Sequence, residues 1–170
     1  MTRPELPEYA PYYAKYIDLV AGDNLLVTLP PQSAKTLAFW RGVTEDEACL
    51  RPSAERWSWK QVLNHLNDTE RIFAYRALRF ARGDQQELPG FEQDDYALAA
   101  DADRMSWEEL IKEYAAIRQA SLALFRNLRS EDWTRMGVAS GNPTSVRAAA
   151  YMVAGHELHH LNILGQDYLL

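Results

Sequence analysis

The chain has 170 residues, of which 47% are hydrophobic and 25% are charged, and its net charge is −6. This length and composition are typical of one folded domain, which we expect to span residues 1–170. The acidic balance, with Lys and Arg scattered among acids, excludes a nucleic-acid backbone as a partner. No apolar run could span a membrane and residues 1–8 resemble no signal peptide, so we expect a cytoplasmic protein without membrane contact.

The single cysteine, Cys49, excludes an internal disulfide and any cysteine-rich zinc module. A free cysteine is usually a small buried residue, and we expect Cys49 to be one. A reactive thiol is the alternative that the sequence leaves open.

The first third of the chain predicts an irregular arm, a short helix and then a longer one. Residues 9–20 are rich in aromatic side chains and predict the short helix. Either residue of the pair 23–24 could cap the next segment. The prolines that begin segment 30–40 suit a turn or the first turn of a helix, which Gly42 ends. Residues 44–47 have the spacing of a capping box and predict a short turn.

The middle of the chain predicts a long helix, a loop and another long helix. Ser58 and Gln61 form a capping box that opens a helix running to about residue 82. Segment 88–104 is predicted to be mostly loop, which is long for a compact domain and suggests a lid or a site wall. A second capping pattern at Ser106 opens a helix that runs to about residue 128.

The last part of the chain predicts a loop and a final helix. Residues 136–143 contain Gly, Ser and Asn and predict a loop. Thr144 or Ser145 caps a helix over 146–165. No segment alternates apolar and polar residues for long enough to predict a strand. The four long helices predict an all-α fold, a four-helix bundle with a short extra N-terminal helix.

Three of the four histidines fall on inward helix faces. Because a helix turns about 100° per residue, His156 and His160 share the apolar stripe of the last helix. His65 lies on the apolar stripe of the helix that begins at Ser58. Buried imidazoles need partners or shifted pKa values, and one shared cation would serve all three.

Three imidazole nitrogens suit zinc, nickel, copper or iron and leave one coordination position open. An open position is what a catalytic metal needs. Histidines that are satisfied within an apolar core, with no metal, are the alternative.

Two residues share the side of His65 and could bind a substrate or a thiol cofactor. Thr69 lies one turn along the helix and Arg76 nearly three turns. Our hypothesis is that Arg76 pairs with a carboxylate of the ligand. The alternative is an internal salt bridge from Arg76 to an acid such as Asp94 or Glu113.

Other polar residues near the histidines are candidates for support rather than for chemistry. His159 lies about 100° from His160, on the flank of its helix, or supports the ligands from outside. Asp68 could support His65 in the same way. Glu70 points away from His65 and is a poor candidate for a general base.

The order and spacing of several segments resemble the DinB-like superfamily, whose members are associated with metal-dependent hydrolysis. The resemblance is carried by residues 57–79 (WSWKQVLNHLNDTERIFAYRALR), 88–91 (LPGF) and 155–160 (GHELHH). It implies an up-down-down-up four-helix bundle and a homodimer. It also implies one divalent metal per chain, zinc or nickel, and carries its three ligands onto His65, His156 and His160.

The resemblance does not imply a single reaction, since similar proteins include thiol S-transferases, thiol-dependent isomerases and stress-response proteins. Our first interpretation is a metal-dependent enzyme that transfers a low-molecular-weight thiol, as a second cofactor, to a small electrophilic substrate. A metal-dependent hydrolase and a non-catalytic metal-binding stress protein are the alternatives. No side chain is assigned as catalytic, because a water or thiolate activated at the metal would act as the nucleophile.

The face of the last helix opposite its histidines is also apolar, which predicts burial against neighbouring helices or a dimer partner. This second stripe comprises Ala150, Ala154, Leu158, Leu161 and Gly165.

Overall fold

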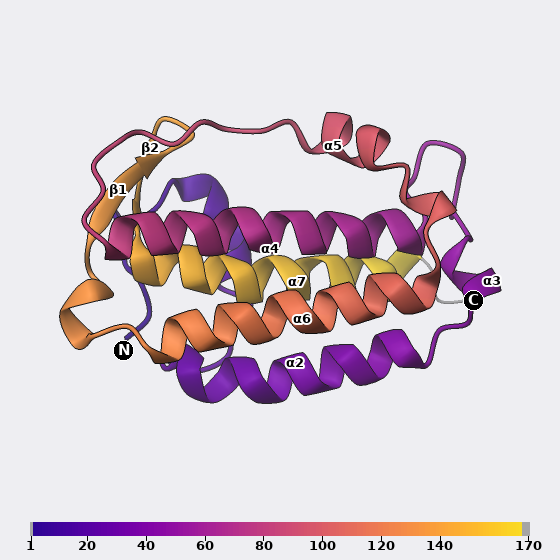
Figure 1. Ribbon diagram of the computed structural model, residues 1–170, viewed down its shortest axis with the longest axis horizontal. Coiled ribbons are helices and arrows are strands. Elements are labelled where there is room, and N and C mark those ends of the chain that lie inside the picture. The colour runs from indigo at the N-terminus through magenta and orange to yellow at the C-terminus, as the bar shows by residue number, and fades with distance from the viewer. Residues whose placement is uncertain (1, 168–170) are drawn as a thin grey trace.

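The computed structural model describes residues 2–167 and is a four-helix bundle, as predicted. Figure 1 shows that two of the long helices run in one direction and two in the other. The order along the chain is up-down-down-up, so the second and third helices are parallel and residues 82–106 return along the length of the bundle. The four are α2 (Leu25–Arg41), α4 (Trp59–Ala81), α6 (Trp107–Arg126) and α7 (Val146–Asp167).

Short elements fill the connections between the long helices. A hairpin joins α6 to α7, and its antiparallel register pairs Met136 with Ser145 and Ala139 with Asn142. The short elements are η1 (Pro11–Tyr13), α1 (Ala14–Ile17), α3 (Glu45–Ala48), α5 (Gln93–Ala100), η2 (Ala102–Arg104), η3 (Ser130–Asp132), β1 (Met136–Ala139) and β2 (Asn142–Ser145).

The predicted starts of three long helices are confirmed by their side-chain caps. The Ser58 hydroxyl accepts a hydrogen bond from the Gln61 backbone N–H, and the Ser106 hydroxyl accepts one from the Glu109 backbone N–H. Ser145 caps α7, since its hydroxyl accepts from the Ala148 backbone at 3.0 Å. Each cap satisfies a backbone donor that the helix leaves unpaired, which stabilises the fold by about 1 kcal/mol.

The helix predicted over 30–40 begins five residues earlier than its prolines suggested. Asn24 caps α2 by accepting a hydrogen bond from the Leu26 backbone, and the two prolines lie inside the helix. Leu25 and Leu29 are fully buried, so packing of the first turns holds the helix despite the backbone donors that proline lacks.

Two segments predicted as loops have regular structure. Most of 92–104 is helical, in α5 and η2, but α5 buries only Ala97 and so shows no apolar periodicity in the sequence. Segment 136–145 is a hairpin of strands too short for alternation to be recognised. Ser140 and Gly141 at its tip have φ angles of 53° and 73°, as a two-residue turn with both central residues left-handed requires.

The expectation that Cys49 is buried is wrong. Its thiol-bearing side chain is exposed at the end of α3. The preceding residue, Ala48, is fully buried and is the one that faces the core, so its neighbour points outward.

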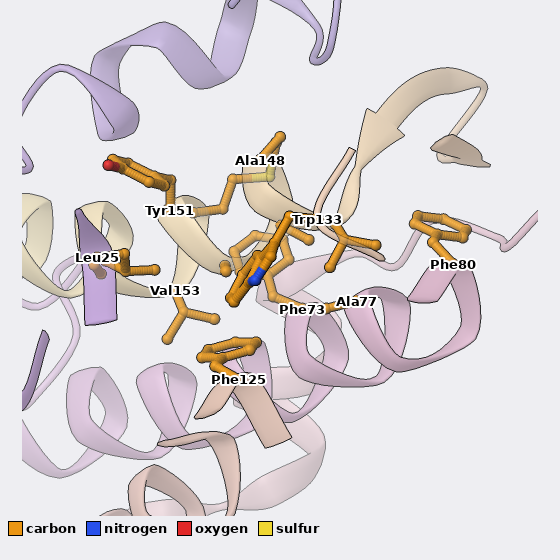
Figure 2. Close-up of a cluster of buried hydrophobic side chains, with 14 of the residues drawn as sticks. Leu25, Phe73, Ala77, Phe80, Phe125, Trp133, Ala148, Tyr151 and Val153 are labelled. Carbon is orange, nitrogen blue, oxygen red and sulfur yellow. The ribbon is translucent and has the colours of Figure 1, made fainter. Parts of the chain in front are cut away.

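The apolar core consists of two clusters, one towards each end of the bundle. Figure 2 shows the larger one, in which Phe73, Phe125 and Trp133 pack beside residues from α2 and α7. The smaller cluster includes Trp40 and Trp107, whose rings meet edge to face at 5.6 Å. Edge-to-face packing of this kind adds to the stability that burial alone provides.

Each long helix passes from one cluster to the other through buried or half-buried polar residues at the same level. We call this level the polar layer and define it by Gln32, Thr36, His65, Glu70, Arg118, His156 and Glu157. These polar residues interrupt the apolar faces of the long helices. None of the described helices combines the length and apolarity that crossing a membrane requires.

The N-terminal helix α1 crosses α7 at Gly155. A Cβ atom on this glycine would lie 2.0 Å from the Tyr16 carbonyl oxygen, so the two backbones can approach only because the side chain is missing. The close approach brings the Tyr16 ring to 5.2 Å from the His156 ring, edge to face. Gly155 therefore sets the position of α1 over the histidines.

We predict that Gly155→Ala destabilises the protein by about 1–3 kcal/mol or more, because the backbone of α1 must move away. Urea denaturation followed by circular dichroism measures the change. Gly165→Ala, on the same helix, is the matched control, since no atom lies within 4 Å of the added Cβ. It should be neutral or stabilise α7 by about 0.5–1 kcal/mol. Equal effects of the two substitutions would contradict the close-packing argument.

Candidate metal centre

The three inward histidines predicted from the sequence lie together, and two of them, His65 and His156, belong to the polar layer. His65 comes from α4, while His156 and His160 come from successive turns of α7. The Nε2 atom of His156 lies 3.1 Å from Nε2 of His65 and 3.1 Å from Nε2 of His160. One ligand atom from each residue lies within 4.8 Å of the others.

The environment keeps these imidazoles uncharged near neutral pH. Burial lowers the pKa of His65 to about 4. Burial, together with the charges of His65, His159 and Lys15, lowers the pKa of His160 to about 3. Burial and the neighbouring histidines also hold the pKa of His156 well below its usual value. The trio is therefore a set of neutral nitrogen donors, the form that binds a metal ion.

This donor set fits a divalent cation. Zinc–nitrogen bonds of about 2.0–2.1 Å at tetrahedral angles place two ligand nitrogens about 3.3 Å apart, close to the spacing found here. Hydrogen bonds between the three imidazoles satisfy their Nε2 atoms less well than a cation does. The Nε2 of His156 has a single lone pair, so it can accept one well-directed hydrogen bond and not two.

Thr69 lies beside the histidines and contacts one of them. Its hydroxyl is 3.4 Å from Nδ1 of His65, one helical turn away. This contact suits the tautomer that carries its proton on Nδ1 and leaves Nε2 as the ligand atom.

The two residues predicted as outer support lie further from the donor atoms. The His159 ring is 5.4 Å from the His160 ring and 5.1 Å from the Tyr16 ring. Asp68 is half-buried and accepts a hydrogen bond from Asn64 at 3.1 Å, with Arg71 at 3.5 Å. The contacts of Asp68 are thus with residues of its own helix and not with His65.

A cavity of about 280 Å³ opens onto His65 and His156, and we call it the histidine pocket. Its volume suits a small ligand. The residues that precede and begin α5 form one wall, as the prediction of a site wall in this segment anticipated. The pocket is lined by Tyr12, Tyr13, Tyr16, His65, Thr69, Phe73, Phe91, Glu92, Gln93, Asp94, Ser140 and His156.

Another wall of the pocket is aromatic and comes from the N-terminal segment. Tyr12, Tyr13 and Tyr16 contact one another with ring centroids 5.3–6.2 Å apart. The Lys15 ammonium lies 3.8 Å from the centroid of the Tyr12 ring. The tyrosines thus give the pocket aromatic surface, while Thr69, Ser140 and the acids before and within α5 give it polar groups.

Arg76 lies behind the wall of the histidine pocket. It is 4% exposed, and its Nη2 donates to the Pro89 carbonyl at 3.0 Å and to the Ser140 hydroxyl at 2.9 Å. Among the described residues no carboxylate forms an ion pair with Arg76. Glu113, one of the acids considered as a partner, pairs with Arg71 instead, at 2.6 Å. A buried guanidinium without an acid is unusual and leaves positive charge beside the pocket.

A buried group of charged residues in the polar layer was missed from the sequence. Arg118 of α6 donates from Nη2 to Glu70 at 2.8 Å and to Glu157 at 2.7 Å. All three are at most 5% exposed. Tyr114 donates to the second of these acids at 2.6 Å. The signal was present, since Arg118 and Glu157 fall among buried apolar positions of their helices.

A larger cavity of about 680 Å³ lies elsewhere, between α2 and α7. It is mainly apolar, and Leu158, Leu161 and Gly165 of the predicted second stripe line it, whereas Ala150 and Ala154 are buried in the core. It contains none of the three histidines, so we assign the chemistry to the smaller histidine pocket.

A profile of the DinB superfamily matches residues 32–164. The chain belongs to this superfamily. The matched region contains all three histidines, whereas Tyr12, Tyr13 and Tyr16 lie outside it.

Among solved structures, this DinB-superfamily chain is similar to YfiT from Bacillus subtilis, with a TM-score of 0.67 and 15% sequence identity over 96% of this chain and 89% of that one. That protein is described as "a probable metal-dependent hydrolase with an unusual four-helix bundle topology". At this identity the likeness establishes the shared fold alone. No curated protein matches the sequence.

Proposed function

We propose that this protein is a metal-dependent enzyme and that hydrolysis is the reaction of its histidine pocket. The observation that carries the proposal is the convergence of three neutral Nε2 atoms on one point beside the cavity. A divalent ion held there by His65, His156 and His160 supplies a Lewis acid with an open coordination position. The description of YfiT as a probable metal-dependent hydrolase supports the same reaction class.

The protein side chains bind and orient rather than attack. With His65 in the tautomer that carries its proton on Nδ1, that ring cannot take a proton from the Thr69 hydroxyl, and the Ser140 hydroxyl accepts from Arg76, so neither faces a general base. Cys49 is exposed on α3 and does not line the pocket. The reaction therefore requires a nucleophile from outside the chain, which is water in hydrolysis.

We predict that the wild-type protein binds one divalent ion per chain and that His160→Ala abolishes stoichiometric binding. Metal analysis after purification without a nickel column, followed by calorimetric titration with Zn²⁺, measures this. At a hundredfold excess over Kd, the ion should stabilise the wild type by about 2.7 kcal/mol. His159→Ala, which removes the adjacent imidazole, should bind as the wild type does. Loss of binding in both variants would contradict the assignment of ligands.

We predict that the zinc-loaded protein releases chromophore from ester or amide substrates without added thiol. The rate should fall to background in His160→Ala, because the Lewis acid is lost. Release that persists in the metal-free protein would contradict a metal-dependent hydrolase. Product that forms only when a low-molecular-weight thiol is present would assign thiol transfer instead.

Thiol transfer is the second candidate, and Arg76 is the observation that favours it. Low-molecular-weight thiols such as glutathione carry carboxylates, and a buried guanidinium without an acidic partner is a suitable site for one. Because Ser140 lies between Arg76 and the pocket, a carboxylate would bind by bonding to the serine hydroxyl or by replacing it on the guanidinium.

If Arg76 binds the thiol cofactor, Arg76→Ala should weaken thiol affinity about 10- to 100-fold, equal to about 1.5–3 kcal/mol, and leave zinc content unchanged. Equilibrium titration of the zinc-loaded protein with a thiol panel measures this. Arg71→Ala removes an arginine of the same helix that pairs with Glu113 and serves as the control. Unchanged thiol affinity in Arg76→Ala would end this role for the residue.

A further inference from the structure

The buried charges of the polar layer do not cancel. The ion cluster, which we define as Glu70, Arg118 and Glu157, contains two carboxylates and one guanidinium. The guanidinium contacts both oxygens of Glu70, at 2.9 and 3.1 Å from Nε, in addition to its bond to Glu157. Burial lowers the pKa of Arg118, but the two carboxylates outweigh it and raise that pKa well above its usual value. Counted as formal charges, two carboxylates on one guanidinium leave the cluster one negative charge in excess.

The other side chains that hydrogen-bond to the ion cluster supply no positive charge. The oxygens of Glu157 also accept from Gln32 at 2.8 Å, from Thr36 at 2.9 Å and from Tyr114. Gln32 and Thr36 are neutral, and burial and the charge of Glu157 raise the pKa of Tyr114, so it donates as a neutral phenol. A structural ion pair needs one carboxylate for each guanidinium, and an uncompensated buried charge costs several kcal/mol.

The ion cluster adjoins one of the three histidines, His156. His156 and Glu157 are consecutive in α7, and a small enclosed cavity of about 10 Å³ is lined by His156 together with all three members of the cluster. The remaining walls are Leu66, Phe73 and Val153, which are apolar and screen charge weakly. The cavity has the volume of about one water molecule and enough polar groups to bind it.

We infer that the Glu70–Arg118–Glu157 cluster is a built-in counter-charge that raises the affinity of the three-histidine site for a divalent cation. The inference rests on the proposed metal centre and extends it to residues that do not touch the ion. Three neutral imidazoles bring no negative charge to a dication, so its charge must be balanced from outside the ligand set. The excess carboxylate charge and the cation stabilise each other across a low-dielectric interior.

Glu70→Gln tests the inference, because it keeps the size of the side chain and an acceptor for Arg118 but brings the cluster to zero charge. We expect its affinity for Zn²⁺, measured by competition with a chromophoric chelator, to fall about tenfold or more. Glu70→Asp retains the charge and should bind Zn²⁺ much more tightly than Glu70→Gln. Glu113→Gln makes the same charge change at a carboxylate that pairs with Arg71, and should match the wild type.

Two further measurements separate an electrostatic role of Glu70 from a structural one. Urea denaturation of each metal-free variant gives its stability, and the Co²⁺ absorption spectrum reports the coordination geometry. Glu70→Gln that is less stable but binds Zn²⁺ as tightly as the wild type would overturn the inference and leave the metal centre intact. A wild-type protein that binds no Zn²⁺ would overturn the metal centre and the inference together. If Glu70→Gln does not fold, Glu157→Gln is measured with the same expected result.

Discussion

The arrangement of the bundle depends on one buried ion cluster. Arg118 of α6 holds Glu70 of α4 and Glu157 of α7, and Glu157 also accepts from Thr36 of α2, so one set of hydrogen bonds joins all four long helices. Charged groups at this depth are stable only when their partners are in place, so the cluster fixes the axial position of each helix against the others. The same register aligns His65 of α4 with the histidines of α7.

Much of the fold was accessible from the sequence because its signals are local. The serine caps and the apolar stripes located the long helices, and the capping residue Ser145 was among those named for α7. The predictions that were wrong concern elements whose formation depends on tertiary contacts. Packing of Leu25 and Leu29 extended α2 beyond its prolines, and α5 buries so little that no periodicity could reveal it.

Part of the candidate site could also be predicted from the sequence, because some of its signals are local. The i, i+4 spacing of His156 and His160 and the inward face of His65 are properties of single helices. Their meeting point, and the tyrosine wall above it, depend on which helices are neighbours, and one sequence does not contain that information. Arg118 could have been found as a charged residue on an apolar face, but its two partners lie 48 and 39 positions away.

The aromatic wall and the histidines come from different parts of the chain. The family profile begins at residue 32, while Tyr12, Tyr13 and Tyr16 come from the segment before it and are held in place at Gly155. The histidines and the α5 side of the pocket thus lie within the matched region, and only the tyrosine wall lies before it. Changes in this short leading segment can therefore reshape the pocket without altering the three donor nitrogens.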